Sequence, residues 1–430
     1  MDLLRITGDT PLTGTVTAGG SKNAALPIMA ASILATEPVL IERVPEVVDV
    51  TTLSAVLAQL GVEVKRQDDG ALRIETVDSS PTRADYELVR RMRASFCVLG
   101  PLLARRRRAV VSLPGGCNLG DRPVDLHLAG LAALGAKLRI DRGYVIAEAD
   151  ELRGADISLL GPHGATVTGT ANVMSAATLA RGTTIIRGAA REPEIVDLAD
   201  FLNTLGARIV GAGEATIEIV GVEHLNGGTH RVIPDRIEAA TLLIAGAITG
   251  GNVHVKNARL EHLGGVLDVL DRAGAELSVS ANSVSILMQN RPRPIQVTTC
   301  PYPGVPTDVQ PQLTALATIA EGRSEIVEGV FPDRFMHVPE LKRLGARIER
   351  AGHAAVVDGS RRLVGAELMA SDLRGGAALV LAALAAEGVS LVRRIYHVDR
   401  GHEQIERKLA RLGAQIERCR DQQPAKVGSS

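Results

Sequence analysis

The sequence predicts an α+β fold of two lobes, each made of three copies of a repeat of about 70 residues. Two recurring patterns predict it. A glycine before Ala or Val marks six helix-to-strand junctions, at intervals of 68 to 74 residues. Between these marks, an Ala/Leu-rich helix, a turn and a β-branched strand recur. We expect sheets on the outside of each lobe and helices within. The six marks are Gly61, Gly135, Gly206, Gly274, Gly345 and Gly413.

The segment before each glycine predicts an amphipathic helix. Leu53, Val56, Leu57 and Leu60 recur at i, i+3, i+4 and i+7, which gives one apolar stripe. The glycine then stands where a helix C-cap requires positive φ. Short alternating stretches such as VEVKR (62–66) and AELSVS (275–280) follow the glycines and predict strands.

The second half of the repeat predicts buried helices. MAASILATEPVLIERV (29–44) and LLIAGAITGGNVHVKNA (242–258) are apolar nearly all round before the turn. We place the first lobe at 22–231, and the second at 1–21 plus 232–430 with a short polar tail. The stretch NGGTHRVIPDR (226–236) is the predicted linker. With these bounds the chain passes between the lobes twice, near residues 20 and 231. Two such connections predict a hinge, and the cleft between the lobes is the expected site.

Composition excludes several classes of protein. Of 430 residues, 45% are hydrophobic and 23% charged, and a net charge of −1 gives no attraction to nucleic acid or membrane. No apolar stretch reaches the ~20 residues of a membrane span, and the N-terminus lacks the features of a signal peptide. Four cysteines without a CxxC pair argue against a disulfide framework or a zinc site and favour the cytoplasm. The missing GxGxxG and P-loop patterns disfavour a nucleotide cofactor.

Two polar motifs interrupt the first lobe. In AGGSKNAALP (18–27), glycines precede Lys22 and Asn23 at a helix start, a pattern typical of anion sites. In RMRAS (91–95), Arg93 opens an apolar helix. The alternative for the first motif is a capped helix with an exposed lysine. The alternative for the second motif is that Arg93 is a surface cation.

A third motif presents a thiol. In LPGGCNLGDRPVDLH (113–127), Cys117 follows two glycines and lies five residues before Arg122. A thiol near a cation can serve as a general acid or a nucleophile. The alternative is an incidental cysteine in a glycine turn.

The second lobe carries polar clusters at its repeat junctions. They occur in YPGVPTDVQPQ, FPDRFMHVPE, ASDLRGG and YHVDRGHE. Each is a weak signal alone, because a histidine at such a place is more often a hydrogen-bonding group than a catalyst. Their charged and imidazole residues are Asp308, Arg334, His337, Asp372, Arg374, His397, Asp399 and Arg400.

Taken together, these motifs resemble the UDP-N-acetylglucosamine enolpyruvyl transferases of the EPSP synthase family. The resemblance covers residues 1 to about 418 and rests on the order and spacing of GGSKNAALP, RMRAS, LPGGC, RPVDLH, AAREPEIVD, PDRIE, PTD-Q, RFMHVPEL, ASDLR and RIYHVDRG. It implies a two-lobed inside-out α/β barrel. It also implies transfer of the enolpyruvyl group of phosphoenolpyruvate to the 3′-hydroxyl of UDP-N-acetylglucosamine in the cytoplasm, with release of phosphate. That reaction is the first committed step of peptidoglycan biosynthesis and the target of fosfomycin, and it needs no metal or cofactor.

The resemblance also implies residue roles. Asp308 takes the proton of the acceptor hydroxyl, and Cys117 delivers a proton to the methylene carbon and can bond covalently to the substrate. Lys22 and Arg400 are catalytic as well as anion-binding. The phosphoenolpyruvate site comprises Lys22, Asn23, Arg122, Arg374 and Arg400.

The implied sugar-nucleotide site departs from the family pattern in one place. Where the family has a Lys-Val-Ser/Thr-Val run, this chain reads LGPHGATV (160–167) without a lysine. The change favours, as an alternative, an enolpyruvyl transferase with another acceptor. A catalytically silent binding homologue is the alternative from another class, and retention of the polar residues argues against it. The implied contacts are Arg93, Arg122, Pro123, Val124, Asp125, Leu126, Ala165, Thr166, Val167, Asp308 and Val330.

Overall fold

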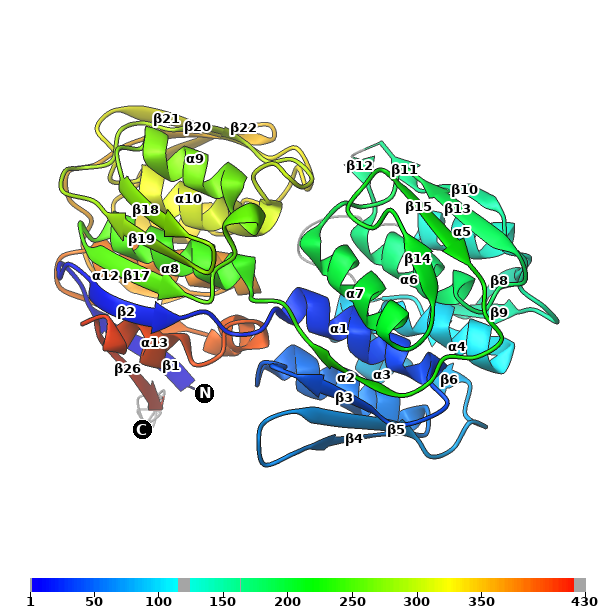
Figure 1. Ribbon diagram of the computed structural model, residues 1–430. Helices are drawn as coiled ribbons and strands as arrows, with labels where there is room; N and C mark the ends of the chain where they lie inside the picture. Colours follow the sequence, from blue (N-terminus) through cyan, green and yellow to red (C-terminus); the bar gives the residue numbers. More distant parts are fainter. Residues whose placement is uncertain (1, 115–123, 163, 421–430) are drawn as a thin grey trace, which may run out of the picture. The chain divides into compact units, whose positions relative to one another are not determined.

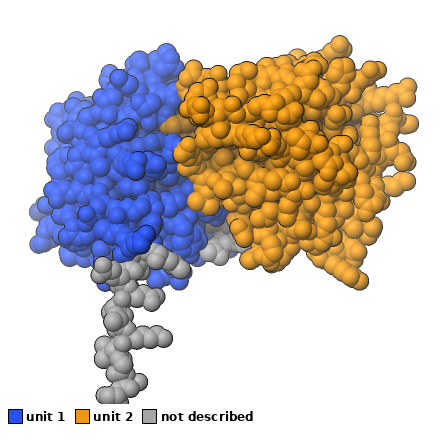
Figure 2. Space-filling view, turned by 90° about the horizontal axis from the view of Figure 1, so that it is seen from below, with its two compact units in different colours: residues 1–18, 236–299, 304–430 blue, residues 19–235, 300–303 orange. Residues whose placement is uncertain are grey.

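The computed structural model describes residues 2–114, 124–162 and 164–420. The chain forms two compact units (Figures 1 and 2). Unit 1 comprises residues 1–18, 236–299 and 304–430, and unit 2 comprises residues 19–235 and 300–303. These divisions fall a few residues from those placed by sequence, and the short segment 300–303 joins unit 2 without any signal in the sequence.

Unit 1 contains three four-stranded sheets among its described residues. Their strand orders are β24-β25-β1-β26, β18-β19-β17-β2 and β20-β21-β23-β22. The strands are β1 (Asp2–Thr7), β2 (Thr13–Thr17), β17 (Asn252–Lys256), β18 (Glu276–Ser280), β19 (Ser283–Leu287), β20 (Gln296–Thr298), β21 (Arg323–Val327), β22 (Arg347–Ala351), β23 (Ala354–Asp358), β24 (Glu367–Met369), β25 (Val389–Arg393) and β26 (Gln415–Arg420).

The helices of unit 1 divide into inner and outer ones. The inner helices α8 (Arg236–Ile248), α10 (Gln310–Ala317) and α12 (Leu373–Ala385) pack against one another, and every residue of α8 is buried. Figure 1 shows them enclosed by the sheets. The others are α9 (Gly264–Arg272), α11 (Val338–Arg343), α13 (Ile405–Arg411) and the 3₁₀ turns η3 (Leu260–His262), η4 (Thr307–Val309) and η5 (Ile395–Arg400).

Unit 2 contains three more four-stranded sheets in its described part, ordered β16-β3-β5-β4, β6-β7-β9-β8 and β10-β13-β15-β14, and a small β11-β12 hairpin. The strands are β3 (Val39–Glu42), β4 (Val62–Arg66), β5 (Leu72–Thr76), β6 (Arg83–Ala84), β7 (Arg108–Ser112), β8 (Lys137–Asp141), β9 (Tyr144–Glu148), β10 (Asp156–Ser158), β11 (Leu160–Gly161), β12 (Gly164–Ala165), β13 (Thr183–Arg187), β14 (Arg208–Val210), β15 (Thr216–Val220) and β16 (Gly228–Arg231).

The inner helices of unit 2 are α1 (Lys22–Ala31), α4 (Leu99–Arg106) and α6 (Val167–Ala177). They are buried along most of their length, as their apolar sequences predict, and α4 packs against α6. The remaining helices are α2 (Val48–Gln59), α3 (Tyr86–Val89), α5 (Asp125–Ala133), α7 (Pro193–Thr204) and the 3₁₀ turns η1 (Ser32–Leu34) and η2 (Arg93–Val98).

All six four-stranded sheets have the same pattern of strand pairing. In each sheet one edge strand pairs in parallel with its neighbour, and the other two pairings are antiparallel. A parallel pair needs a long crossover connection, and a helix supplies it in mixed folds. The sheets are therefore mixed, and buried helices cover their inner faces, as the sequence predicts.

The glycine marks cap the outer helices. All six have positive φ, between 70° at Gly61 and 102° at Gly206. They follow α2, α5, α7, α9, α11 and α13, and each is followed closely by a strand. An L-residue at such a position would be strained, which explains why glycine recurs there. The prediction of a glycine C-cap at each junction is confirmed.

The connecting segments at the unit boundary pair with each other inside unit 2. Ser21 N–H donates to Ile233 O at 2.8 Å, and Asp235 N–H donates to Gly19 O at 2.9 Å. The predicted linker 226–236 is wrong in part, because Gly228–Arg231 forms β16 and pairs in parallel with β3. Asn226 and Gly227 immediately precede this edge strand, and Gly228 is its first residue.

Candidate active site

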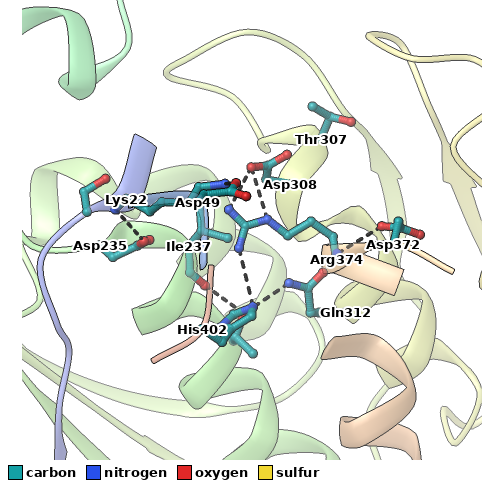
Figure 3. A network of polar contacts seen from close by, with 12 residues as sticks. Lys22, Asp49, Asp235, Ile237, Thr307, Asp308, Gln312, Asp372, Arg374 and His402 are labelled. Carbon is teal, nitrogen blue, oxygen red and sulfur yellow. Dashed lines mark hydrogen bonds and ion pairs between the residues drawn. The ribbon is translucent and has the colours of Figure 1, made fainter. Parts of the chain in front are cut away.

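In unit 1 a buried ion-pair cluster surrounds Asp308 (Figure 3). Arg374 places Nη2 at 2.9 Å and Nε at 3.2 Å from Asp308 Oδ2, and Arg334 Nη1 lies 2.8 Å from Oδ1. The side chains of Arg374 and Arg334 are only 2% and 6% exposed, whereas that of Asp308 is 25% exposed. Two buried guanidinium groups therefore fix a carboxylate that still reaches solvent.

Local structure sets these positions. Asp308 lies in η4, immediately before α10, and Arg374 lies in the first turn of α12. Asp372 caps α12, because its carboxylate accepts hydrogen bonds from the N–H groups of Arg374 and Gly375 at 3.0 and 2.9 Å. The helix start thus holds the backbone from which Arg374 extends toward Asp308.

Two histidines lie at the edge of this cluster. His402 is buried, and its Nε2 lies 3.4 Å from Arg374 Nη1. Burial lowers the pKa of His337 to about 4, a shift that nearby Asp372 opposes and Arg334 reinforces. His337 is therefore neutral at pH 7.

Arg400 ends η5, and a neighbouring ion pair anchors that turn. Asp399 accepts two hydrogen bonds from Arg418 of β26, at 2.7 and 3.0 Å. Burial lowers the pKa of His397 in the same turn, and the positive charge of Arg400 lowers it further. The C-terminal strand therefore holds the segment that carries Arg400.

In unit 2, Lys22 begins α1 and is 8% exposed. Its Nζ lies 3.2 Å from Asp49 Oδ2, and its backbone N–H lies 3.4 Å from Asp235 Oδ2. Ser21 caps the helix by accepting a hydrogen bond from Ala24 N–H at 3.3 Å. Figure 3 shows Lys22 with these two carboxylates, while Asn23 follows at the next position of the helix.

Arg93 begins η2 beside a buried thiol and a buried imidazole. Burial raises the pKa of Cys97 to about 12 against the opposing effect of Arg93. Burial, reinforced by Arg93, lowers the pKa of His127 to about 3. His127 contacts Asn172 through Nδ1 at 2.8 Å and Thr168 through Nε2 at 3.1 Å.

Six described residues of unit 2 that we predict to contact the sugar nucleotide lie at two helix starts. Val124 precedes α5, while Asp125 and Leu126 lie in its first turn. Thr166 caps α6, accepting a hydrogen bond from Gly169 N–H at 3.2 Å, between Ala165 of β12 and Val167 of α6. The Leu126 side chain also lies so close to Gly161 that a Cβ there would be 3.0 Å from Leu126 Cδ1. The α5 start therefore packs against the β11-β12 hairpin.

Three predicted site residues, Cys117, Arg122 and Pro123, lie outside the described residues. Within the described ranges, no group of three His, Cys, Asp or Glu side chains could hold a metal ion. Nor is any helix there long and apolar enough to cross a bilayer.

The structure adds partners that sequence reasoning did not assign. Asp49 pairs with Lys22 across 27 positions of sequence, and Arg374 pairs with Asp308 across 66. The motif FPDRFMHVPE contains Arg334, but nothing in the sequence predicts its contact with Asp308. No spacing signal connects these residues, because the fold alone brings them together.

Comparisons with known proteins agree with this architecture. The family model described as EPSP synthase (3-phosphoshikimate 1-carboxyvinyltransferase) matches residues 6–409. An enolpyruvyl transferase structure, NikO from Streptomyces tendae, has a TM-score of 0.87 at 28% identity and covers 97% of this chain and 98% of its own. An EPSP synthase structure from Acinetobacter baumannii has a TM-score of 0.75 at 20% identity, covers 98% of this chain and all of its own, and supports the fold alone.

Relatives with similar sequences show to which branch of the family the chain belongs. A UDP-N-acetylglucosamine 1-carboxyvinyltransferase of Methylacidiphilum infernorum is 50% identical over 97% of this chain and 99% of its own length. A protein of the same name from Erwinia tasmaniensis is 51% identical over the same shares. The chain therefore belongs to the EPSP synthase family of enolpyruvyl transferases, in the branch of the UDP-N-acetylglucosamine 1-carboxyvinyltransferases.

Proposed function

We propose that the protein transfers the enolpyruvyl group of phosphoenolpyruvate to the 3′-hydroxyl of UDP-N-acetylglucosamine and releases phosphate. This is the first step of peptidoglycan synthesis. Identity of about half over nearly the whole chain to transferases of that name carries the proposal. The Asp308 cluster supports it, because an addition to phosphoenolpyruvate needs a fixed base surrounded by cations.

Phosphoenolpyruvate brings a phosphate and a carboxylate, so its site must supply several fixed positive charges. The family resemblance assigns this role to Lys22, Arg122, Arg374 and Arg400, with Asn23 next to Lys22 in the sequence. In the described structure Arg374 donates to Asp308. Its charge therefore acts on the base as well as on the anion.

The reaction is an addition followed by an elimination. The acceptor oxygen bonds to C2 of phosphoenolpyruvate, and its proton passes to Asp308. The methylene C3 gains a proton from Cys117 in the same addition. In the elimination C3 loses a proton, the C2–O bond to phosphate breaks and the enol ether remains. Arg334 and Arg374 hold the Asp308 carboxylate in place through both steps.

The proposed acceptor contacts are those that the family resemblance implies: Arg93, the segment from Arg122 to Leu126, the Ala165–Val167 segment, Asp308 and Val330. Helix starts suit a diphosphate, because their free N–H groups point outward.

A cytoplasmic location, predicted from the cysteine content, stays a prediction.

A second candidate function is enolpyruvyl transfer to a different acceptor. The LGPHGATV stretch favours it, since it places no lysine at the β11-β12 hairpin. Phosphate release from phosphoenolpyruvate separates the two candidates when UDP-N-acetylglucosamine, shikimate 3-phosphate or no acceptor is supplied. We expect release with UDP-N-acetylglucosamine alone. Release with the shikimate ester alone would overturn the proposed function.

We also propose that the six sheets derive from one repeated unit of about 70 residues, and that the chain becomes more compact when it binds its substrates. The pattern of strand pairing that all six sheets share and the spacing of the glycine caps support the repeat. Small-angle scattering tests the closure. Saturating UDP-N-acetylglucosamine should reduce the radius of gyration, and an unchanged scattering profile would count against a hinge.

A further inference from the structure

Glu328 is a fully buried carboxylate just beyond β21, and four donors point at it. Its Oε1 accepts hydrogen bonds from Thr299 Oγ1 at 2.6 Å, Val330 N–H at 2.9 Å and Phe331 N–H at 3.0 Å. Its Oε2 accepts a hydrogen bond from Thr307 Oγ1 at 2.9 Å. A carboxylate is the side chain that can accept all four at once.

These donors come from three separate segments of unit 1. Thr299 follows β20, Thr307 begins η4, and residues 330–331 lie in the loop after β21. Gly329 N–H also donates to Thr299 Oγ1 at 3.0 Å. Glu328 thus ties the loop that carries Val330 to the turn that carries Asp308.

A continuous chain of hydrogen bonds leads from Glu328 to Asp308. The Thr307 hydroxyl donates to Glu328 and accepts a hydrogen bond from Arg334 Nη1 at 3.0 Å. The same Nη1 lies 2.8 Å from Asp308 Oδ1. Because Thr307 must donate toward Glu328, its lone pairs face Arg334, which fixes the guanidinium against Asp308.

We propose that Glu328 is a positioning residue that holds two parts of the site: Asp308 through Thr307 and Arg334, and the Val330 loop through its backbone N–H groups. The inference rests on the proposed role of Asp308 as the base. Glu328 acts through these groups and touches no substrate atom.

Glu328→Gln separates the two effects. The amide oxygen replaces Oε1, because the reverse orientation would point the NH₂ group at two N–H donors. The NH₂ group then faces Thr307, where a hydrogen-bond acceptor is required. The Val330 loop keeps its contacts, but the chain to Asp308 is broken.

We expect kcat of Glu328→Gln to fall by about ten- to a hundredfold, the range for a misplaced reacting group. The KM for UDP-N-acetylglucosamine should stay within about twofold of the wild-type value. Glu328→Ala loses both connections, so its kcat should fall and its KM should rise. Glu325→Gln is the matched control, since Glu325 is an exposed glutamate on β21.

Thr307→Val tests the chain itself. It removes the hydroxyl at nearly constant volume, and we expect it to lower kcat about as much as Glu328→Gln does. The kcat of the double variant should be little lower than that of either single variant, because all three variants break the same chain of hydrogen bonds. Additive losses would overturn the proposal.

Steady-state kinetics, with folded protein quantified by circular dichroism, supply the readout. A kcat for Glu328→Gln within twofold of the wild type would contradict the positioning role, as would a rise in KM alone. Failure of the proposed function has a separate signature, because the wild type itself would then release no phosphate in the presence of UDP-N-acetylglucosamine. Failure of the base assignment would appear as wild-type turnover in Asp308→Asn, whatever Glu328→Gln does.

Discussion

In unit 1 the Asp308 carboxylate lies against the guanidinium groups of Arg334 and Arg374, whereas in unit 2 the Lys22 ammonium lies against the Asp49 carboxylate. The Lys22 side chain is 10% exposed and that of Asp308 is 25% exposed. In each unit a candidate functional group is held by buried charges of opposite sign. Asp308 in unit 1 is negative, as a base must be. Lys22 in unit 2 is positive, as a group that binds an anion must be.

The comparison teaches that the two groups are fixed differently. Arg374 bonds Asp308 Oδ2 through two nitrogens, a geometry that restricts the plane of the carboxylate. Lys22 offers a compact charge on a flexible stem, which suits a ligand that arrives and leaves. Substitutions in the two units should therefore reveal positioning of a base in one and anion affinity in the other.

The largest effect is expected in unit 1. Asp308→Asn keeps the shape and one acceptor oxygen but cannot take a proton, so kcat should fall by about 10²- to 10⁴-fold. Steady-state phosphate release is the measurement. Asp333→Asn is the control, because Asp333 is 70% exposed and pairs with Arg350 at 2.7 Å. Equal losses in both variants would end the assignment of Asp308 as the base.

In unit 2 the expected loss is somewhat smaller. Lys22→Ala removes a charge that pairs with the substrate anion, so kcat/KM for phosphoenolpyruvate should fall between about thirtyfold and a few thousandfold. Arg400→Ala, which removes a proposed anion-binding cation of unit 1, should lower the same constant by a similar factor. Lys65→Ala is the control, since Lys65 is 60% exposed and pairs with Glu63. Near-native kinetics in both test variants would remove these two cations from the site.

Thiol labelling compares Cys117, which follows two glycines in the sequence, with Cys97, which is buried. Fosfomycin should modify Cys117, and faster with UDP-N-acetylglucosamine present. Cys97 should stay unmodified, because burial raises its pKa to about 12 and leaves almost no thiolate. Cys117→Asp should escape labelling and keep activity, because a carboxylic acid can still deliver a proton, and Cys117→Ser should be far less active. Peptide mass spectrometry reads the result, and label on Cys97, Cys300 or Cys419 would contradict it.

The smallest effect concerns stability. The folded protein keeps His127 neutral with a pKa of about 3, but the unfolded chain binds a proton near pH 6.5. The free energy of unfolding should therefore fall as pH drops below about 6.5. From pH 7 to 5 this histidine contributes about 2 kcal/mol of that loss.

His127→Gln should be less sensitive to acid by about that amount, measured as the difference between urea unfolding at pH 7 and at pH 5. His337 titrates in both proteins and cancels in the comparison. Exposed His224→Gln is the control and should keep the wild-type difference. The same pH sensitivity in His127→Gln and the wild type would show that His127 is not the group responsible.

Sequence predicted the regular parts of the fold well. The glycine spacing located six caps with positive φ, and the apolar stretches located the buried helices, since both follow from local geometry. The predicted 226–236 linker includes the unit boundary but is wrong for residues 228–231, because these form the edge strand β16 without an alternating apolar pattern. Nothing in the sequence indicates that residues 300–303 belong to unit 2.

The site was predictable only as a set of residue types. Motif resemblance singled out Lys22 and Asp308, but their partners lie far away in sequence and follow no spacing rule. Glu328 shows the limit most clearly. Its role depends on four donors from three segments, which only the folded chain brings together.

One measurement tests the central claim most directly: phosphate release from phosphoenolpyruvate, followed together with the mass of the sugar nucleotide. The account predicts one phosphate for each enolpyruvyl ether of UDP-N-acetylglucosamine, and no release without the acceptor. Phosphate release that does not depend on the acceptor, or an unchanged mass of UDP-N-acetylglucosamine at full phosphate release, would contradict it.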